Sequence, residues 1–199
     1  MAGVMVMAFG YAPGATPLDP DEAAGLLPRH ISTQAELNAW EEANIVNADA
    51  WAIRQTKREL LDEGFVRSLH RKMFDKTWRW AGSFRSSNKN IGVEWSQIST
   101  RLHDLLENTR YQVAHEVFPA DELAVRFHHQ LVLVHAFPNG NGRHSRLMAD
   151  ALVTRLGATR FTWGQASLTA SGGARDQYLT ALRAADKGKP DLLMQFARA

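Results

Sequence analysis

Apolar residues recur at intervals of three and four along most of this chain, and this spacing constrains the fold more than any other feature. It is clearest in two runs: Phe65, Leu69, Met73 and Phe74, and Leu123, Phe127, Leu131 and Val134. Such spacing places apolar side chains on one face of an α-helix. We expect helices over about residues 32–45, 48–61, 65–80, 98–106, 119–135, 174–185 and 190–198, and one that follows the glycine-rich loop and continues to residue 157.

Residues 84–98 break this helical pattern. Serine, asparagine, lysine and glycine crowd positions 86–92, between Phe84 and the apolar group around Ile91 and Val93. A turn-rich group flanked by apolar residues is typical of a short β-hairpin. The sequence therefore predicts an all-α, mainly helical fold with one small β-hairpin.

The first thirty residues differ from the rest of the chain. Seven glycines and prolines lie between Gly10 and Pro28, and both residue types interrupt regular structure. We therefore expect an extended N-terminal arm over residues 1–30. The length of 199 residues suits one further domain, which we place at residues 31–199.

Composition limits the partners and the location that we expect. The 23 Lys and Arg residues are interleaved with 21 Asp and Glu residues, so no basic field favours a nucleic-acid partner. Gly10 and Pro13 interrupt the apolar N-terminus well short of the roughly 20 residues that a membrane span needs, so we expect no membrane segment. The absence of cysteine excludes disulfides and thiol catalysis and fits a reducing cytoplasm.

One segment, from His135 to Arg146, combines residue types that bind anions. Gly140 and Gly142 flank Asn141, so the backbone can turn tightly and bring N–H groups close to a ligand. The helix that follows adds its unpaired N-terminal N–H groups and the positive end of its dipole. We therefore predict an anion-binding loop over residues 135–146.

The charged residues of this segment point to phosphate. Arg143 and Arg146 lie in the first turn of the expected helix, where a cation is unfavourable unless an anion offsets it. Their guanidinium groups suit phosphate oxygens, and two of them three residues apart can hold neighbouring groups of a polyphosphate. His135 ends the preceding helix, and an imidazole with a pKa near its usual value of about 6.5 suits a general base at neutral pH.

The remaining histidines near this loop do not form a metal motif. His128, His129 and His144 have no carboxylate four residues further on and show no His-x-x-x-His spacing. We expect them to be core or surface residues. Tyr178 is equally suited to contact an adenine or to lie in the core.

The ordered set of His135, Phe137, Gly140–Arg143 and Arg146 resembles the signature of the Fic/Doc family. Two further stretches, Trp80-Ala81-Gly82 and Arg175 to Leu182, extend the resemblance over most of the chain. Within the family, Ala15 to Pro20 looks closest to the small bacterial proteins called mobile mystery protein B.

The resemblance implies a helical Fic core that transfers AMP from ATP to a Ser, Thr or Tyr hydroxyl of a target protein. It assigns to His135 the role of general base, which deprotonates that hydroxyl for attack on the α-phosphorus. It further implies that Gly140, Asn141 and Gly142 hold the α- and β-phosphates, while Arg143 neutralises developing charge and Arg146 holds the γ-phosphate.

The resemblance also implies a flap at residues 84–98, which registers the target segment by strand addition through Asn90, Ile91, Gly92 and Val93. The target protein itself stays unknown at this point. A role in a toxin–antitoxin pair would be in keeping with the family.

One departure from the family concerns the metal. The family's acidic residue, which holds Mg²⁺ or Mn²⁺, is Asn139 in this chain. Magnesium accepts a neutral carbonyl oxygen but favours carboxylate, so we expect weaker metal binding, with either a lower activity or a different transferred group.

The family commonly carries an inhibitory helix whose glutamate occupies the second arginine. Residues 32–45 are our candidate for that helix, and Ser32 and Glu36 match the family's motif in spacing alone because Leu37 follows. We therefore expect Glu36 to block Arg146, with Glu41 and Glu42 as competitors. An antitoxin partner is the alternative to this self-inhibition.

Two other functions are compatible with the same residues. One is Doc-like phosphotransfer, in which the γ-phosphoryl group moves, although that subgroup departs from the Gly-Asn-Gly-Arg pattern present here. The other is a nucleotide-binding interaction module with little catalysis, in which Asn139 would reflect the loss of catalytic activity.

Overall fold

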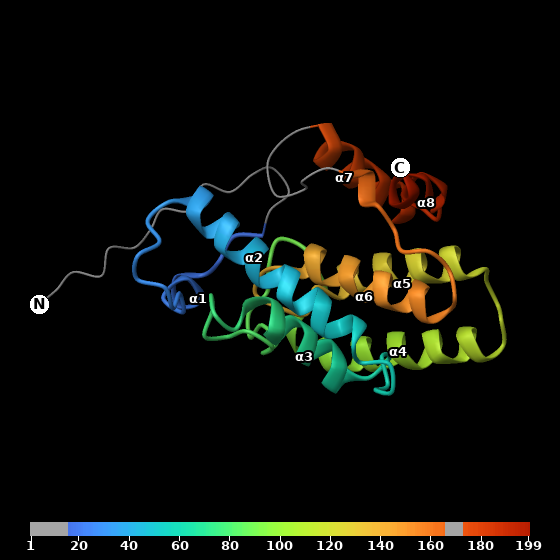
Figure 1. Cartoon of the computed structure of the whole chain (residues 1–199), viewed down its shortest axis with the longest axis horizontal. Helices are drawn as coiled ribbons and strands as arrows, with labels where there is room; N and C mark the ends of the chain where they lie inside the picture. The colour runs from blue at the N-terminus through green and yellow to red at the C-terminus, as the bar shows by residue number, and fades with distance from the viewer. Residues whose placement is uncertain (1–15, 166–172) are drawn as a thin grey trace, which may run out of the picture.

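The structure, a computed structural model, describes residues 16–165 and 173–199 and is built from helices (Figure 1). The α-helices are α1 (Pro20–Ala23), α2 (Gln34–Ile53), α3 (Glu63–Phe74), α4 (Ile98–Ala114), α5 (Ala120–Val134), α6 (Asn141–Arg155), α7 (Gly173–Ala185) and α8 (Asp191–Arg198). Two short 3₁₀ helices, η1 (Trp95–Gln97) and η2 (Trp163–Gln165), complete them. The prediction of a mainly helical fold is confirmed.

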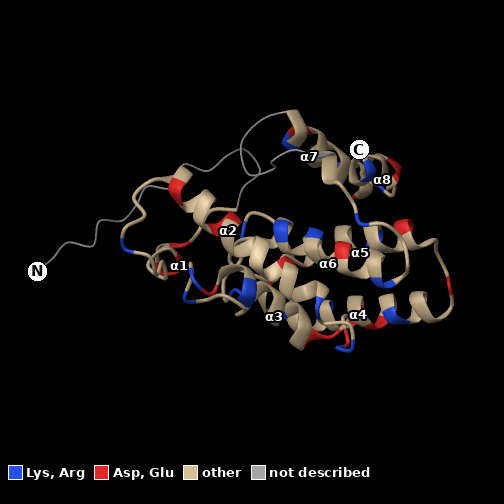
Figure 2. Ribbon diagram, in the orientation of Figure 1, with Lys and Arg blue, Asp and Glu red and all other residues tan. Residues whose placement is uncertain are grey.

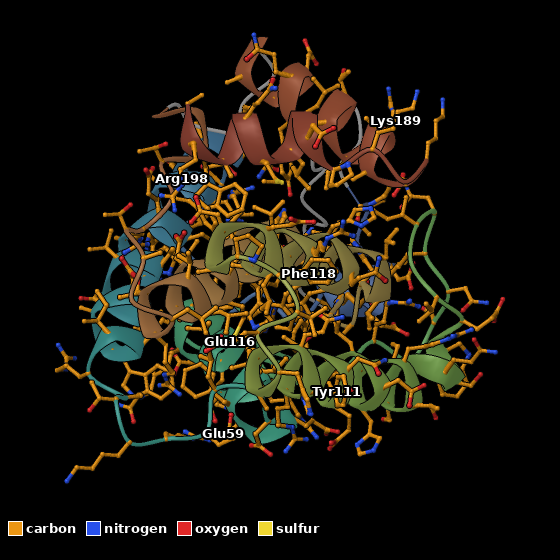
Figure 3. All side chains as sticks on the ribbon, turned by 90° about the vertical axis from the view of Figure 1, so that its right-hand side faces the viewer. Glu59, Tyr111, Glu116, Phe118, Lys189 and Arg198 are labelled. Carbon is orange, nitrogen blue, oxygen red and sulfur yellow. The ribbon has the colours of Figure 1, made fainter. Side chains whose placement is uncertain are left out.

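Helices α5 and α6 lie side by side in the middle of the molecule and pack more extensively on each other than any other pair. Helices α2 and α3 pack together and against α6, and α4 lies along α5. Helices α7 and α8 form a further layer, which Figure 3 shows above α5 and α6, with α4 and its Tyr111 below them. Arg198 of α8 links that layer to α5, because its Nε donates to the Asp121 carboxylate of α5 at 2.6 Å.

The predicted apolar faces form the core. Phe65, Leu69 and Met73 of α3 are fully buried, as is Phe127 of α5 to within a few per cent. Helix α3 begins at Asp62, whose carboxylate accepts a hydrogen bond from the Phe65 N–H and so satisfies one unpaired donor of the first turn. Burial of this single face holds α3 beneath the loop that follows α5.

The boundaries of three helices differ from those predicted, and one of these helices is α4, which continues to Ala114 instead of ending near residue 106. Helix α2 runs without a break from Gln34 to Ile53, where we expected one helix up to residue 45 and another over residues 48–61. Helix α3 ends at Phe74 instead of near Trp80. Residues 75–82 instead form turns that pair with the N-terminal arm, since the Leu27 N–H donates to the Thr77 carbonyl at 2.9 Å.

The predicted β-hairpin is wrong: among the described residues there is no sheet, and residues 84–94 form bends and turns before η1. Side chains take the hydrogen bonds that a hairpin ladder would use. Arg85 donates to the carbonyls of Ser87 and Val93, and the Asn88 side chain accepts from the Trp95 N–H at 2.9 Å. Because side chains make these hydrogen bonds, the backbone of this segment does not form the row of paired N–H and carbonyl groups that joins the two strands of a hairpin.

The described part of the N-terminal arm is ordered against the domain and is not wholly extended. It contains α1, where Asp19 and Glu22 form a capping box. The first fifteen residues of the expected arm lie outside the described residues. No helix in the described ranges is both long enough and apolar enough to span a membrane.

Candidate active site

The loop between α5 and α6 begins with a left-handed residue at His135. His135 has φ 50° and ψ 55° and is the C-cap of α5, so the chain turns sharply as the helix ends. A left-handed conformation is uncommon for a residue with a side chain and costs about 1 kcal/mol or more. That conformation lets the short loop to Gly140 bring His135 and the first turn of α6 into one site.

His135 is buried and hydrogen-bonded to a hydroxyl group. Only 5% of the residue is exposed, and its Nε2 lies 2.9 Å from Oγ1 of Thr16, in the N-terminal arm. Burial, reinforced by the positive charge of Arg85, lowers the pKa of His135 to about 4. The ring is therefore neutral near pH 7, and in the tautomer with its proton on Nδ1 the Nε2 atom accepts from the Thr16 hydroxyl.

Arg85 connects the flap to His135. Its Nε donates to the His135 carbonyl at 2.7 Å, and its backbone N–H donates to the Ala136 carbonyl at 3.0 Å. Gly92, at φ 100°, fits against the same residue, since a Cβ placed there would lie 2.5 Å from the His135 Cβ. The predicted flap residue Gly92 therefore lies beside the predicted base, although the flap is not a hairpin.

Two buried side chains hold the loop in shape. The Asn141 amide accepts from the Phe137 N–H at 2.9 Å and donates to the Phe137 carbonyl at 2.7 Å, so this side chain braces the loop and does not face a ligand. His70 of α3 accepts from the Gly82 N–H through Nδ1, which leaves Nε2 to donate to the Asn139 carbonyl at 3.1 Å. Burial keeps the pKa of His70 well below its usual value, which favours this neutral form.

Gly140 is the N-cap of α6 and has φ 77°. A Cβ at this position would lie 2.5 Å from the Phe74 ring, so both the backbone and the space require glycine. Because glycine has no side chain to cap the helix, the N–H groups of the first turn of α6 are directed at the loop. Such N–H groups and the helix dipole are the features from which the sequence predicts an anion-binding site, and that site stays a prediction.

The two arginines of α6 have different partners. Arg143 donates to the Glu41 carboxylate of α2 at 2.6 Å, and Glu41 also accepts from the Trp78 indole N–H at 2.6 Å. Arg146 lies over the ring of Tyr178 of α7, with 5.4 Å from its Cζ to the ring centroid. Figure 2 shows acidic positions of α2 beside the basic first turn of α6.

Glu36 does not occupy the place that we expected. Its carboxylate accepts hydrogen bonds from the backbone N–H groups of Ser32 and Thr33 at 2.8 and 3.0 Å, so it completes the capping box of α2. A residue at the third position of a helix is held at the N-terminus by this arrangement and cannot reach across to α6. Among the three glutamates considered, Glu41 contacts an arginine of the loop, and that arginine is Arg143 instead of Arg146.

Asn139 does not suit a metal ligand in this arrangement. Its Oδ1 accepts from the Gly140 N–H at 2.6 Å, and its Nδ2 donates to the Thr16 carbonyl at 3.2 Å. In the described ranges no three His, Asp or Glu side chains form a cluster that could hold a metal ion. The residues present therefore do not fit a protein-held Mg²⁺ or Mn²⁺ at this position.

Comparison with known proteins decides the family. The sequence model described as the Fic/DOC family matches residues 60–153, which contain His135, the glycine loop and both arginines. This part of the chain belongs to the Fic/DOC family. Among curated proteins, no match was found.

Solved structures of Fic domains share the fold. The BepC effector of Bartonella tribocorum, with bound AMPPNP, is 17% identical with a TM-score of 0.67, and the alignment covers 89% of this chain and 95% of that one. A Bep effector Fic domain of Bartonella quintana, with bound ADP, is 18% identical with a TM-score of 0.60 and coverages of 85% and 86%. Fic-1 of C. elegans is 21% identical with a TM-score of 0.60, and this chain, 88% of which is aligned, spans only 51% of that structure.

The Fic loop brings most of the predicted site residues together. One site contains His135, Asn139, Gly140 and, in the first turn of α6, Arg143. The flap residue Gly92 lies at the edge of this site. Arg146 lies further along α6, under α7. Tyr178 is 6% exposed and hydrogen-bonds to His128, so it is a core residue.

The sequence analysis did not identify four residues at or next to this site: Thr16, His70, Arg85 and Lys89. Thr16 and His70 contact the loop from distant parts of the chain. Arg85 contacts the loop from the flap, and Lys89 of the flap pairs with the N-terminal arm. Only His70 left a signal, since it lies on the apolar face of α3 between Leu69 and Met73, where a polar residue needs a partner.

The Fic chain also has a groove of about 890 Å³ between α4, α5 and the turn after α7. Phe118 at its rim is labelled in Figure 3. None of the residues that line this groove belongs to the loop 135–146. Of the predicted site residues, the flap residue Val93 lines the groove, whereas His135 and the anion-binding loop lie outside it.

Proposed function

We propose that this Fic chain is a protein adenylyltransferase, which transfers AMP from ATP to a Ser, Thr or Tyr hydroxyl with His135 as general base. One observation carries the proposal: a hydroxyl oxygen, that of Thr16, lies 2.9 Å from His135 Nε2 beside the uncapped first turn of α6. A base and a phosphate-binding helix terminus at one place suit the attack of a hydroxyl on a phosphorus atom.

The acceptor side of the proposed reaction depends on a neutral imidazole. Burial and Arg85 lower the pKa of His135, so Nε2 can accept a proton from a bound hydroxyl over the whole neutral pH range. The flap would hold the target segment next to this atom through the exposed backbone around Asn90 and Ile91.

The phosphate side depends on charge and on backbone donors. The N–H groups at the start of α6, with Gly140 and Gly142 allowing close approach, would bind the α- and β-phosphates. Arg143 would neutralise charge that develops on the leaving pyrophosphate, and Arg146 would hold the γ-phosphate. The Bartonella relatives with bound AMPPNP and ADP support a nucleotide as the substrate.

We further propose that α2 regulates this site and that the enzyme acts on a bacterial protein as a toxin-like or regulatory factor. Glu41 neutralises Arg143, which would otherwise be available to a phosphate. An antitoxin partner remains unnecessary in this scheme, because the chain carries its own acidic group at the phosphate site.

Labelled ATP tests the proposed reaction. The full chain is incubated with a bacterial lysate and with ATP labelled at either the α- or the γ-phosphorus, with Mg²⁺ and with Mn²⁺. We expect protein-bound label from the α-position and a mass gain of one AMP group, and we expect His135→Ala to remove both. His103→Ala is the control, since His103 is an exposed histidine of α4.

The other outcomes separate the alternatives. Label transferred from the γ-position would identify a Doc-like phosphotransferase. Binding of ATP without transfer in any condition would indicate an interaction module. Transfer that persists in His135→Ala would refute the assignment of the base.

A further inference from the structure

We propose that Thr16 is a self-modification site, whose hydroxyl accepts AMP in the same molecule; this inference rests on the proposed adenylyltransferase function. Thr16 is 7% exposed, and its side chain is the hydroxyl that hydrogen-bonds to His135 Nε2. No other hydroxyl of residues 16–165 or 173–199 has a hydrogen bond to that imidazole among those observed. Thr16 therefore occupies the place of an acceptor.

The backbone of Thr16 is also bound to the loop. Its carbonyl accepts from Asn139 Nδ2 at 3.2 Å, and Asn139 directly precedes Gly140, the N-cap of α6. The hydroxyl is thus held between the base and the start of the helix that would bind phosphate. Two-point attachment of side chain and backbone orients an acceptor for attack.

Ion pairs fix the segment that follows Thr16 across the flap. Asp19 accepts from Ser87 at 2.6 Å and pairs with Lys89 at 2.8 Å, and Glu22 pairs with Lys89 at 2.6 Å. The Lys89 side chain is only 3% exposed and that of Glu22 14%, so the pair with Glu22 is shielded from solvent, whereas the Asp19 side chain is about half exposed. The hydrogen bond from Lys89, and after it that from Ser87, lowers the pKa of Asp19, which keeps this carboxylate charged.

Further contacts hold the segment to the domain beyond the flap. The Trp80 indole donates to the Glu22 carbonyl at 3.0 Å, and Leu26 forms an antiparallel bridge with Trp78. Residues 16–27 therefore cross from the α5–α6 loop, over the flap, to the turns after α3. Within this segment, the hydroxyl that contacts His135 is that of Thr16.

The proposed step is a displacement at phosphorus. Thr16 Oγ1 gives its proton to His135 Nε2 and forms a bond to the α-phosphorus of ATP. The bond from that phosphorus to the oxygen bridging to the β-phosphate breaks, and pyrophosphate leaves with the electron pair. The product is a phosphodiester between Thr16 and AMP, and the protonated imidazole returns its proton to solvent.

Peptide mass spectrometry after incubation with α-labelled ATP tests the proposal. It is performed on the full chain and on the Glu41→Gln variant, in which Arg143 is released. We expect one AMP on Thr16, loss of that AMP in Thr16→Val, and its return in Thr16→Ser. Ser83→Ala is the control, because Ser83 is an exposed hydroxyl outside the flap and the loop.

The dependence on protein concentration identifies transfer within one molecule. We expect the fraction modified per unit time to be the same over a hundredfold dilution, because an intramolecular reaction is first order. In the lysate assay, Thr16→Val should pass more label to other proteins than the unmodified sequence does, since no internal hydroxyl then competes.

The outcomes separate this inference from the function on which it rests. AMP on other residues or on lysate proteins, with Thr16 unmodified in both backgrounds, would overturn the role of Thr16 and leave the adenylyltransferase standing. A rate that falls in proportion to dilution would also overturn transfer in cis. No AMP transfer to any protein in either background would overturn both.

Discussion

The imidazole of His135 is buried beside Arg85, and its pKa of about 4 should be visible in catalysis. A general base acts in its neutral form, so transfer should stay constant from pH 7 down to about pH 4 and fall below that. We expect the ¹³C-detected titration of the His135 ring to have the same midpoint, within the pH range where circular dichroism shows a folded chain. An inflection near the usual histidine pKa would contradict the burial of this group.

Gly140 and Gly157 both have positive φ values, 77° and 84°, but different surroundings. A Cβ at Gly157 meets nothing within 4 Å, so Gly157→Ala should lose only about 1 kcal/mol from backbone strain. Gly140→Ala adds the clash with the Phe74 ring, worth about 1–3 kcal/mol more, and should displace the loop.

Urea denaturation and AMP transfer, measured on the same two glycine variants, distinguish these effects. Gly157→Ala should retain transfer, and Gly140→Ala should lose it while remaining folded. Equal stability losses in the two variants would show that the Phe74 ring moves aside.

The predicted base and phosphate-binding residues share one twelve-residue segment, residues 135–146, and that is why they could be proposed from the sequence. His135, Gly140 and Arg143 are close in the chain, so their chemistry can be judged locally. Thr16 lies 119 residues from His135, and Glu41 lies 102 residues from Arg143. Contacts over such separations depend on how helices pack, which a spacing pattern does not encode.

At the scale of the element, α2 places the Glu41 carboxylate against Arg143, a residue of the proposed phosphate site. Glu41→Gln keeps an acceptor for the Trp78 indole but removes the charge that pairs with Arg143. We expect ATP affinity and AMP transfer to rise roughly tenfold or more, since the side chains of this pair are only 6% and 18% exposed.

Isothermal titration with ATP and label incorporation both measure this effect of Glu41. Glu42→Gln is the matched control, because Glu42 is the next residue of α2 and is exposed. Glu36→Gln should also leave transfer unchanged, since Glu36 caps α2. Equal behaviour of Glu41→Gln and Glu42→Gln would exclude the regulatory role of the pair.

The flap shows where element prediction fails. Turn-forming residues between Phe84 and Val93 correctly indicated a reversal of the chain, but the same composition serves a hairpin or a set of turns. Arg85 decides between them by donating to backbone carbonyls within the segment. Long helices such as α5 were predictable because the apolar residues that share one face of the helix are also the residues buried in the core.

For the whole molecule, buried histidines make stability depend on pH. Burial lowers the pKa of His128 to about 3 and of His135 and His144 to about 4, and holds the pKa of His70 well below its usual value. Between about pH 6.5 and 4 the unfolded chain therefore binds more protons than the folded chain. The free energy of unfolding should fall by about 1.4 kcal/mol per pH unit for each such histidine.

Asp150 has the opposite effect on how the free energy of unfolding depends on pH. Its burial raises its pKa to about 6, so below that pH the folded chain takes up a proton before the unfolded chain does and gains stability. The histidines outnumber it, so urea midpoints should drop clearly from pH 7 to pH 5. His128→Gln should reduce the slope and exposed His103→Gln should not; an unchanged midpoint over this range would contradict neutral burial.

The bonds of Arg85 have an evolutionary consequence. One guanidinium joins the carbonyls of His135, Ser87 and Val93, and carbonyls are present in every residue type. Substitutions at the exposed tip, Asn90 and Ile91, can therefore accumulate without reshaping the flap. Related chains can therefore differ at the tip of the proposed docking flap while Arg85 keeps the flap beside His135.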